Sequence, residues 1–375
     1  MYLKNLHLQH FRNYPEQSIE FTGSKTILLG ENAQGKSNLL EAVELLSVLR
    51  SHRTSRDRDL VREGEEVARL VANLKREDRG NLEMGMVLRG NGRRSVALNG
   101  VGLRRQLDFL GVLNMVQFSS LDLDLVRGGP EMRRHWLDGL LVQLEPIYAH
   151  LLQQYGQILK QRNALLKAIR QGKVGFDPEQ MALWDAQLAT TGTRLARRRS
   201  RLLQRLNPIA DRWHQAISGG SEHLNLTYAP KFDFVDTNAI EDIRQAFLVR
   251  LQQKAIAEQQ QGTSLVGPHR DEVVLTINQT PAREYGSQGQ QRTLVLALKL
   301  AELELIEAVT GETPLLLLDD VLAELDLQRQ NQLLDAIQDR VQTIITTTHL
   351  GSFDAQWLSS AQIFQVENGT IVGKV

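Results

Sequence analysis

The hydrophobic positions of this chain change their spacing twice between the two termini. Short runs of alternating or continuous apolar residues come first, long stretches with apolar residues at helical spacing follow, and strand-like runs return near residue 270. Alternation is typical of half-buried strands, and spacings of three and four residues are typical of amphipathic helices. The pattern predicts an α/β domain built from both ends of the chain, with a mainly helical domain inserted between them.

The N-terminal part contains predicted strands of two kinds. Leu6 and Leu8 alternate with polar residues, whereas residues 25–29 form a short and more continuously apolar run. A continuous run is typical of a strand that is buried on both faces. Residues 67–98 hold three further runs separated by turn residues, which predicts an antiparallel meander. Another apolar run ends near Phe118.

Long helices are predicted in the middle of the chain. Pro130 follows two glycines and Pro178 precedes another long helical stretch, and proline is favoured in the first turn of a helix. We therefore divide the chain into a head, residues 1–124 and 262–375, and an inserted helical lobe, residues 125–261.

Composition limits the classes of function. The 375 residues include 44 basic and 44 acidic side chains and no cysteine. A net charge of zero excludes a protein that coats nucleic acid through bulk charge, while a local basic groove stays compatible with it. The lack of cysteine excludes disulfides, thiolate metal sites and thiol nucleophiles. No apolar run approaches the roughly 18 residues of a membrane helix, and the N-terminus has no signal-peptide core, so we expect a soluble, cytoplasmic protein without a membrane partner.

The first chemical motif lies between a predicted buried strand and an amphipathic helix. It matches the P-loop pattern GxxxxGK[ST] and consists of Gly30, Glu31, Asn32, Ala33, Gln34, Gly35, Lys36 and Ser37. The glycines allow backbone N–H groups to surround phosphates, and the following helix directs its positive N-terminus at the same charge. Lys36 is expected to reach the β- and γ-phosphates and Ser37 to bind Mg²⁺. The motif predicts binding of a nucleoside triphosphate.

The second motif is the pair Asp319 and Asp320, which follows four leucines. Because α/β sheets bind ligands at the C-terminal ends of their strands, we expect both carboxylates beside the P-loop. Asp319 is placed to hold Mg²⁺, and Asp320 is placed to orient the attacking water. These two motifs alone are compatible with kinases, GTPases and many ATPases.

Further segments resemble those of ABC-type ATPases. Residues 286–291 resemble the signature motif, residues 323–326 resemble the D-loop, and His349 stands at the position of the switch histidine. Gln117 suits the glutamine of the Q-loop. In that class the signature residues, here Ser287, Gly289 and Gln290, complete the nucleotide site of a second protomer in a head-to-tail dimer. Asp326 is the aspartate of the segment that resembles the D-loop. Asp320 stands where most ABC proteins have glutamate, so we expect slow hydrolysis.

Blocks along nearly the whole chain are similar to those of bacterial RecF, a family of SMC-like ABC ATPases. They are HFRNY at 10–14, GENAQGKSNLLEA at 30–42, SHRT at 51–54, GGP at 128–130, VGPHRDE at 266–272, YGSQGQQRT at 285–293 and LLLLDDVLAELD at 315–326. Residues 135–260 are the least diagnostic part. The resemblance implies an ATPase head with a helical lobe and no long coiled coil. It also implies that Arg12 lies near the nucleotide, since related heads place an N-terminal arginine there.

The same resemblance implies a function. RecF proteins bind ATP and DNA, dimerise around two nucleotides and act at gaps or stalled forks. They work with RecR and RecO to load RecA on single-stranded DNA, and they contribute to the SOS response. Whether this chain prefers single-stranded, duplex or gapped DNA stays open.

One helical segment offers an independent indication of DNA binding. Its arginines share one face by spacings of i, i+3, i+4, i+7 and i+11; they are Arg194, Arg197, Arg198, Arg201 and Arg205. Such a stripe suits contacts to phosphates rather than to base edges. A solvated helix face, or pairing with acids elsewhere, explains the same pattern.

Two other classes of function share some of these motifs. The nucleotide-binding subunit of a membrane transporter has the P-loop, the signature and the switch histidine, but the helical insertion and the RecF-like blocks argue against it. A monomeric kinase or simple NTPase has no use for the segment that begins at Gly286, because that segment acts on a second protomer.

Overall fold

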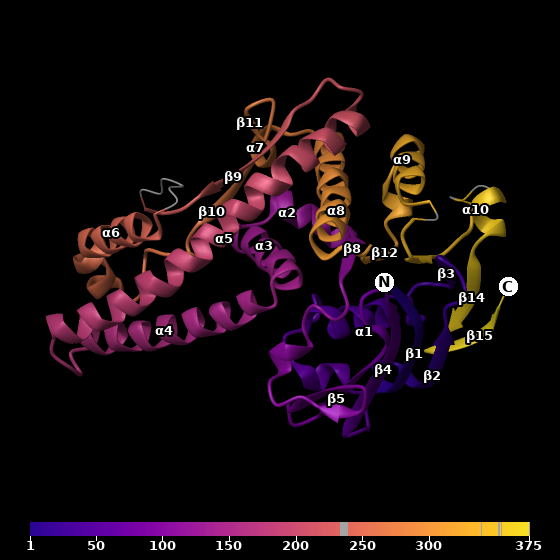
Figure 1. Ribbon diagram of the computed structural model, residues 1–375, viewed down its shortest axis with the longest axis horizontal. Coiled ribbons are helices and arrows are strands. Elements are labelled where there is room, and N and C mark those ends of the chain that lie inside the picture. The colour runs from indigo at the N-terminus through magenta and orange to yellow at the C-terminus, as the bar shows by residue number, and fades with distance from the viewer. Residues whose placement is uncertain (233–238, 339, 352, 354, 375) are drawn as a thin grey trace. The chain divides into compact units, whose positions relative to one another are not determined.

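The protein is described by a computed structural model, which covers residues 1–232, 239–338, 340–351, 353 and 355–374. Its chain forms two compact units (Figure 1). The first unit comprises Met1–Leu123, Ala216–Gly220 and Arg292–Val375, and the second comprises Asp124–Gln215 and Ser221–Gln291. The predicted α/β class, with both chain ends in one unit, is confirmed.

The first unit contains a six-stranded sheet in the order β15–β14–β3–β13–β12–β8. All neighbouring strands are parallel except β14 and β15. The strands are β3 (Lys25–Leu29), β8 (Met115–Ser119), β12 (Leu315–Asp319), β13 (Thr343–Thr347), β14 (Gln362–Glu367) and β15 (Thr370–Lys374). Asp319 is level with Thr346 on β13 and with Ser119 on β8, so the C-terminal ends of these strands meet at one edge.

A second sheet of this unit is antiparallel, with the order β2–β1–β4–β5–β6–β7. Its strands are β1 (Tyr2–Phe11), β2 (Tyr14–Glu20), β4 (Val67–Arg76), β5 (Gly80–Arg89), β6 (Arg94–Leu98) and β7 (Val101–Gly102). Strands β4 to β6 are the meander predicted for residues 67–98. Asn99 and Gly100 both have positive φ, as the tight turn that follows β6 requires.

Helix α1 (Lys36–Val48) is the central element of the core. It contacts β4 of the antiparallel sheet and β8, β12 and β13 of the mixed sheet. Leu39, Leu40, Val43 and Leu46, whose spacing predicts the helix, are all fully buried. Since α1 is packed between two sheets, the N-terminus of this helix is held in a fixed position.

Apart from α8 (Gln288–Thr310), which enters this unit at Arg292, the remaining helices described in it are short. They are the 3₁₀ helices η1 (Asp57–Leu60), η2 (Gln106–Phe109), η3 (Ser120–Leu123) and η4 (Leu322–Glu324), and the α-helices α9 (Leu327–Ile337) and α10 (Ala355–Ser359).

The second unit consists of helices and a small antiparallel sheet in the order β11–β10–β9. Its elements are α2 (Asp124–Arg127), α3 (Pro130–Leu144), α4 (Ile147–Arg170), α5 (Pro178–Ser218), β9 (Leu224–Ala229), α6 (Ile240–Gln261), β10 (Glu272–Ile277), β11 (Thr280–Pro281) and α7 (Ala282–Tyr285). Pro130 and Pro178 are the first residues of their helices, as predicted. No helix in the described ranges combines the length and the apolarity that crossing a membrane requires.

The boundaries of the head and the helical lobe stay a prediction. Residues 262–291 lie in the second compact unit because β10 pairs with β9 there, whereas the sequence assigned them to the head. Helix α8 (Gln288–Thr310) begins in the second unit and continues in the first.

The interior of the second unit contains a charged network around Arg199. This guanidinium is 3% exposed and donates to both carboxylate oxygens of Asp138, at 2.9 and 2.8 Å, and to the carbonyl of Pro268 at 2.6 Å. The hydroxyl of Tyr148 donates to the same carboxylate at 2.6 Å. A buried charge needs such partners, so Arg199 stabilises the interior.

Residues 266–272, the VGPHRDE segment, extend this network, because Pro268 supplies the carbonyl that accepts from Arg199. Gly267 has φ 126°, and a Cβ at this position would lie 2.5 Å from the hydroxyl of Tyr155. That hydroxyl lies 2.7 Å from Nδ1 of His269. Burial lowers the pKa of His269 to about 4, so the ring is neutral at pH 7 and serves as a polar packing group.

We predict that Arg199→Ala lowers the free energy of unfolding by about 3 kcal/mol, because it leaves the Asp138 carboxylate, whose side chain is only 15% exposed, without its charge partner. Arg201→Ala, two residues further along the same helix at an exposed position, is the control and changes this free energy by less than about 0.5 kcal/mol. Urea unfolding followed by tryptophan fluorescence measures both, since Trp136, Trp184 and Trp213 lie in the second unit. Equal free energies of unfolding for the two variants would contradict the stabilising role of Arg199.

Candidate nucleotide-binding site

The loop of residues 30–37 connects the end of β3 to α1 and has the backbone of a phosphate-binding loop. Ala33 and Gly35 have positive φ, of 65° and 114°. A Cβ at Gly35 would lie 2.7 Å from the side-chain amide of Asn13, so only glycine fits without displacement. The same amide donates to the carbonyl of Gln34 at 3.0 Å, and the hydroxyl of Tyr14 donates to that of Gly35 at 3.0 Å. The β1–β2 turn therefore holds the loop in shape.

Lys36 is buried at the start of α1. Its ammonium donates to the carbonyls of Gly30 at 2.6 Å and Glu31 at 2.9 Å. Burial lowers the pKa of Lys36, and the nearby carboxylates of Asp320 and Asp319 partly offset that effect. A desolvated ammonium at the mouth of such a loop interacts strongly with an anion, because little water has to be displaced from it.

The carboxylate of Asp319 joins the ends of three structural elements. Its Oδ1 accepts hydrogen bonds from the hydroxyl of Ser37 at 2.8 Å and from that of Thr346 at 2.7 Å. The hydroxyl oxygen of Thr346 in turn accepts from the backbone N–H of Asp320 at 2.9 Å. The structure thus brings together Ser37 of α1 and Asp319 of β12, as the sequence predicts.

The backbone of Asp320 has φ 55°, in the left-handed region that is strained for a residue with a side chain. Its side chain is exposed at the edge of the sheet. Strained backbone at the end of a strand is common at functional sites, where it directs a side chain out of the regular sheet.

Two other residues predicted to be catalytic, Gln117 and His349, lie in and just beyond strands of the same sheet. Gln117 lies inside β8, level with Leu317 and two residues before the end of the strand. Its amide nitrogen is buried, and no hydrogen-bond partner for it occurs among the described residues. His349 is exposed just beyond β13, where its carbonyl accepts from the hydroxyl of Thr347 at 2.8 Å. The catalytic roles of Gln117 and His349 stay predictions.

Arg12 forms a two-point ion pair with Glu41 of α1, at 2.9 and 2.6 Å, and donates to the carbonyl of Asp59 at 2.8 Å. Glu41 is fully buried. All of these partners of the Arg12 guanidinium are protein groups. The expected contact of Arg12 with nucleotide stays a prediction.

The signature residues form the N-terminal cap of α8. The hydroxyl of Ser287 accepts from the backbone N–H of Gln290 at 3.2 Å, and the Gln290 side chain accepts from the N–H of Ser287 at 2.8 Å. This reciprocal pair is a capping box. The amide of Gln290 also donates to Glu222 at 2.8 Å. Ser287 is exposed, and Gly289 lies within the first turn of the helix.

Asp326 caps α9 in a similar way. Its carboxylate accepts from the backbone N–H of Arg329 at 3.0 Å and pairs with the guanidinium of the same residue. These interactions lower the pKa of Asp326. Asp326 is therefore ionised and exposed at the start of a helix.

A family model described as the RecF/RecN/SMC N-terminal domain matches residues 2–372. The DNA replication and repair protein RecF of Nostoc punctiforme is 68% identical over 373 residues, which cover 99% of this chain and 99% of that relative. The chain belongs to the RecF family.

Solved structures agree with membership of the RecF family. A structure of the recombination mediator protein RecF with ATP, in the RecFOR pathway, is 33% identical and has a TM-score of 0.91, covering 100% of this chain and 97% of the other. A Smc head domain from Pyrococcus furiosus, bound to the C-terminal domain of ScpA, is 16% identical with a TM-score of 0.55 and covers 100% and 96%. The second likeness shows the fold alone.

The oxygen atoms at this RecF-family site fit Mg²⁺. Ser37 and Asp319 offer a hydroxyl and a carboxylate oxygen 2.8 Å apart, and Mg²⁺ in nucleotide sites is held by one or two such groups together with phosphates. Among the described residues no group of three or more His, Cys, Asp or Glu side chains is arranged to hold a metal ion.

Sequence reasoning missed several residues that shape the site. Thr346 lies inside an apolar strand, and its hydroxyl near the C-terminal edge was the one available signal. Asn13 and Tyr14 belong to the RecF-like block HFRNY, although nothing in that block indicates their contacts with the loop. Glu222 carries no signal in the sequence, because its contact with Gln290 spans 68 residues.

We predict that Thr346→Val weakens Mg²⁺-dependent nucleotide binding and lowers ATP hydrolysis roughly tenfold, since the Asp319 carboxylate loses one of its two fixed donors and small misplacements are costly at reacting centres. Thr348→Val, on the same segment, serves as the control. Titration with a fluorescent ATP analogue, with Mg²⁺ and with a chelator, measures the effect. If Thr346→Val lowers the nucleotide affinity by the same factor with the chelator as with Mg²⁺, Thr346 acts on the phosphate-binding loop and not through Asp319.

Proposed function

We propose that this chain is an ATP-binding and ATP-hydrolysing, DNA-binding protein of recombinational repair. The observation that carries the proposal is the 2.8 Å hydrogen bond between Ser37 and Asp319 at the end of a phosphate-binding loop, in a chain of the RecF family. The relatives are named DNA replication and repair proteins, and the solved RecF with ATP is described as a recombination mediator. Membership of this family disfavours the transporter subunit.

The roles of the site residues follow from their chemistry. The loop amides and Lys36 bind the phosphates, while Ser37 and Asp319 hold Mg²⁺. When bound, Mg²⁺ neutralises the charge that develops on the transferred phosphoryl group. Asp320 orients the attacking water, with Gln117 and His349 near the γ-phosphate. An aspartate side chain is shorter than the usual glutamate, so we propose slow hydrolysis that resets the protein.

The signature residues act on a second copy of the chain. Ser287 is exposed at the N-terminus of a long helix, which directs partial positive charge at a phosphate. We propose that two copies enclose two ATP molecules head to tail, with Ser287, Gly289 and Gln290 of each copy completing the site of the other. Asp326 lies at the same kind of helix start and completes the contact.

DNA is the proposed ligand of the dimer. Arg194, Arg201 and Arg205 are exposed on α5, which supports a phosphate-binding role for the predicted stripe. Arg197 and Arg198 are only half-exposed, and Arg198 pairs with Glu145 at 2.9 Å. Partnership with RecR, RecO and RecA, a contribution to the SOS response and a cytoplasmic location are proposed from the family.

We predict that ATP, and not ADP, strengthens binding of a fluorescently labelled gapped duplex, and that Lys36→Arg removes this gain because arginine does not fit the small pocket of the lysine ammonium. Fluorescence anisotropy with ATP, with ADP and without nucleotide measures it. The absence of DNA binding in every nucleotide state at low salt would overturn the proposal.

A further inference from the structure

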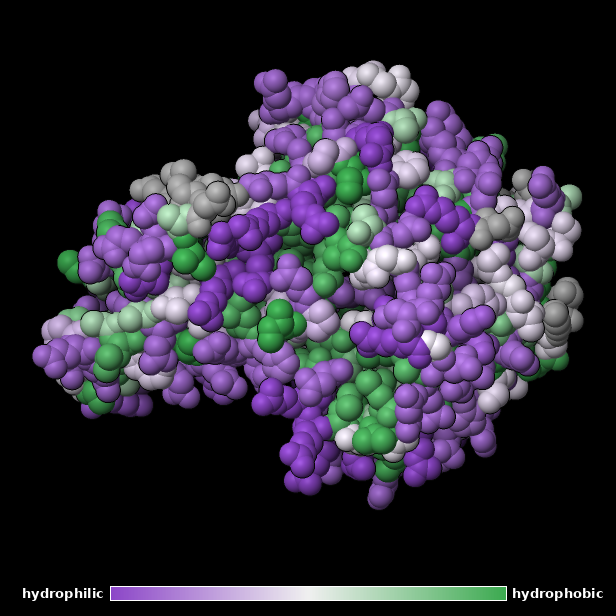
Figure 2. Space-filling view, viewed as in Figure 1, coloured by the Kyte–Doolittle hydropathy of each residue, from purple (hydrophilic) through white to green (hydrophobic). Residues whose placement is uncertain are grey.

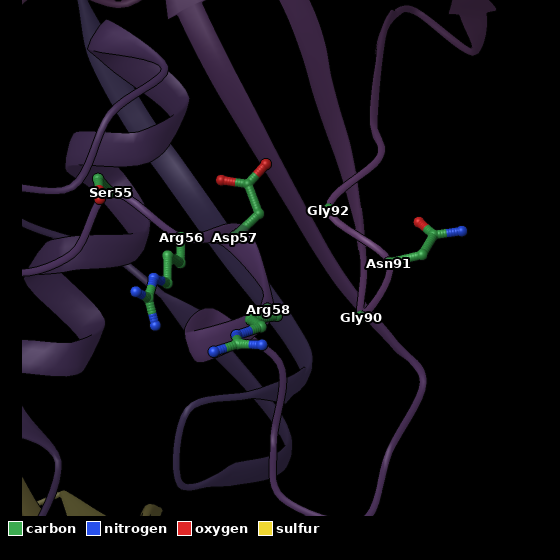
Figure 3. Close-up of a pocket in the computed structure, with 7 residues that line it drawn as sticks. All are labelled: Ser55, Arg56, Asp57, Arg58, Gly90, Asn91 and Gly92. Carbon is green, nitrogen blue, oxygen red and sulfur yellow. The ribbon is translucent and has the colours of Figure 1, made fainter.

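A cavity of about 640 Å³ opens on the surface of the first unit, between the segment before and within η1 and the turn that joins β5 to β6. Its lining residues are Ser55, Arg56, Asp57, Arg58, Gly90, Asn91 and Gly92. In Figure 3 the side chains of Arg56 and Arg58 lie on one side of the cavity and the turn of residues 90–92 lies on the other. None of these residues belongs to the nucleotide site.

The positive charge at this cavity is only partly compensated. Asp57, the one acid that lines it, is held by the guanidinium of Arg94 at 3.1 and 2.5 Å. Arg58 contacts Asp59 at 3.5 Å in a pair whose side chains are 63% and 40% exposed, and such solvated pairs are weak. Glu66 is an exposed acid beside the turn, and its carbonyl accepts from the N–H of Gly90 at 2.8 Å. Residues 55–58 and 89–94 together still carry five arginines and one acid, so the walls of the cavity have an excess of positive charge.

The turn between β5 and β6, on the other side of the cavity, is flanked by arginines and has an accessible backbone. Residues 89–94 read RGNGRR and contain no acid. Gly92 has φ 79°, and a Cβ at this position would meet no atom within 4 Å, so the turn is open to a ligand. Arg93 is exposed beside it. Arg104 and Arg105 are exposed next to Gln106, whose amide donates to the carbonyl of Arg94 at 2.9 Å.

The segment that carries Arg56 and Arg58 is fastened to the helix that begins with the nucleotide-binding residues. Arg53 donates to the side chain of Asn38 at 2.5 Å, and Asn38 directly follows Ser37. The hydroxyl of Ser51 donates to Glu41 at 2.5 Å, and His52 lies 2.7 Å from Glu44. Three successive residues of the segment are therefore attached to α1.

We propose that Arg56, Arg58 and Arg93 form a binding surface for the phosphodiester backbone of DNA, separate from the arginine stripe of α5. Arginine is the side chain that best matches phosphate oxygens. Two guanidinium groups that line the open cavity, with exposed Arg93 next to the turn on its other side, match neighbouring phosphates. The lining contains no aromatic ring for base stacking, so the contact is sequence-independent. The attachment to α1 ties this surface to the element that binds the nucleotide. This inference rests on the proposed DNA-binding function.

The test compares the double variant Arg56→Ala/Arg58→Ala with the wild-type chain by anisotropy of a labelled duplex between 50 and 200 mM salt. The slope of log K against log salt is negative, and each lost phosphate contact reduces its magnitude by about 0.9. We therefore expect the magnitude of the slope to decrease by roughly 2 and the affinity at low salt to fall about tenfold. The double variant Arg56→Lys/Arg58→Lys keeps the charges and is expected to retain most of the slope. Basal ATP hydrolysis, measured without DNA, reports that each variant is folded.

Two controls separate the outcomes. Arg79→Ala removes an exposed arginine from the turn between β4 and β5 of the same sheet and is expected to leave the slope unchanged. Arg201→Ala/Arg205→Ala tests the α5 stripe. If wild-type protein binds DNA and the Arg56/Arg58 variant keeps the wild-type slope, the inference is wrong. If wild-type protein binds no DNA, the proposed function itself fails.

Discussion

The hydrogen bonds to the Asp319 carboxylate are the constraint on which the site depends. One side-chain oxygen accepts from Ser37 at the start of α1 and from Thr346 near the end of β13, while Asp319 itself ends β12. Moving any of these three elements by one residue of register would separate the carboxylate from its donors. The two sheets that enclose α1 maintain this alignment, and the β1–β2 turn holds the phosphate loop through Asn13 and Tyr14.

Much of this arrangement could be predicted from the sequence, because it depends on local patterns. The P-loop lies between a continuous apolar strand and a helix with apolar residues at helical spacing, and both elements form where the spacing predicts them. Asp319 is at the end of a buried strand, where parallel strands place their ligand-binding groups. The capping of α8 by Ser287 and Gln290 follows the local S-x-x-Q pattern, which is contained in the segment that resembles a signature motif.

The features that could not be predicted depend on contacts between distant residues. Arg199 stands among five other arginines of one helical segment, and only the tertiary structure distinguishes it as the buried partner of Asp138. The ion pair of Arg12 with the buried Glu41 also joins residues that are 29 positions apart in the chain. Likewise, residues 272–277 belong to the second unit because they pair with β9. This pairing could not be predicted because the paired residues are 43 or more positions apart in the chain.

The central claim is that a complete ATP site needs residues from two copies of the chain. The most direct test mixes two variants that are each expected to be inactive, Lys36→Ala, which lacks the phosphate-binding lysine, and Ser287→Arg, which blocks the signature. In a mixed two-fold dimer one site combines an intact loop with an intact signature, so ATP hydrolysis is expected to recover to roughly a quarter of the wild-type rate. If the mixture stays as inactive as either variant alone while both variants remain folded, the shared site is contradicted.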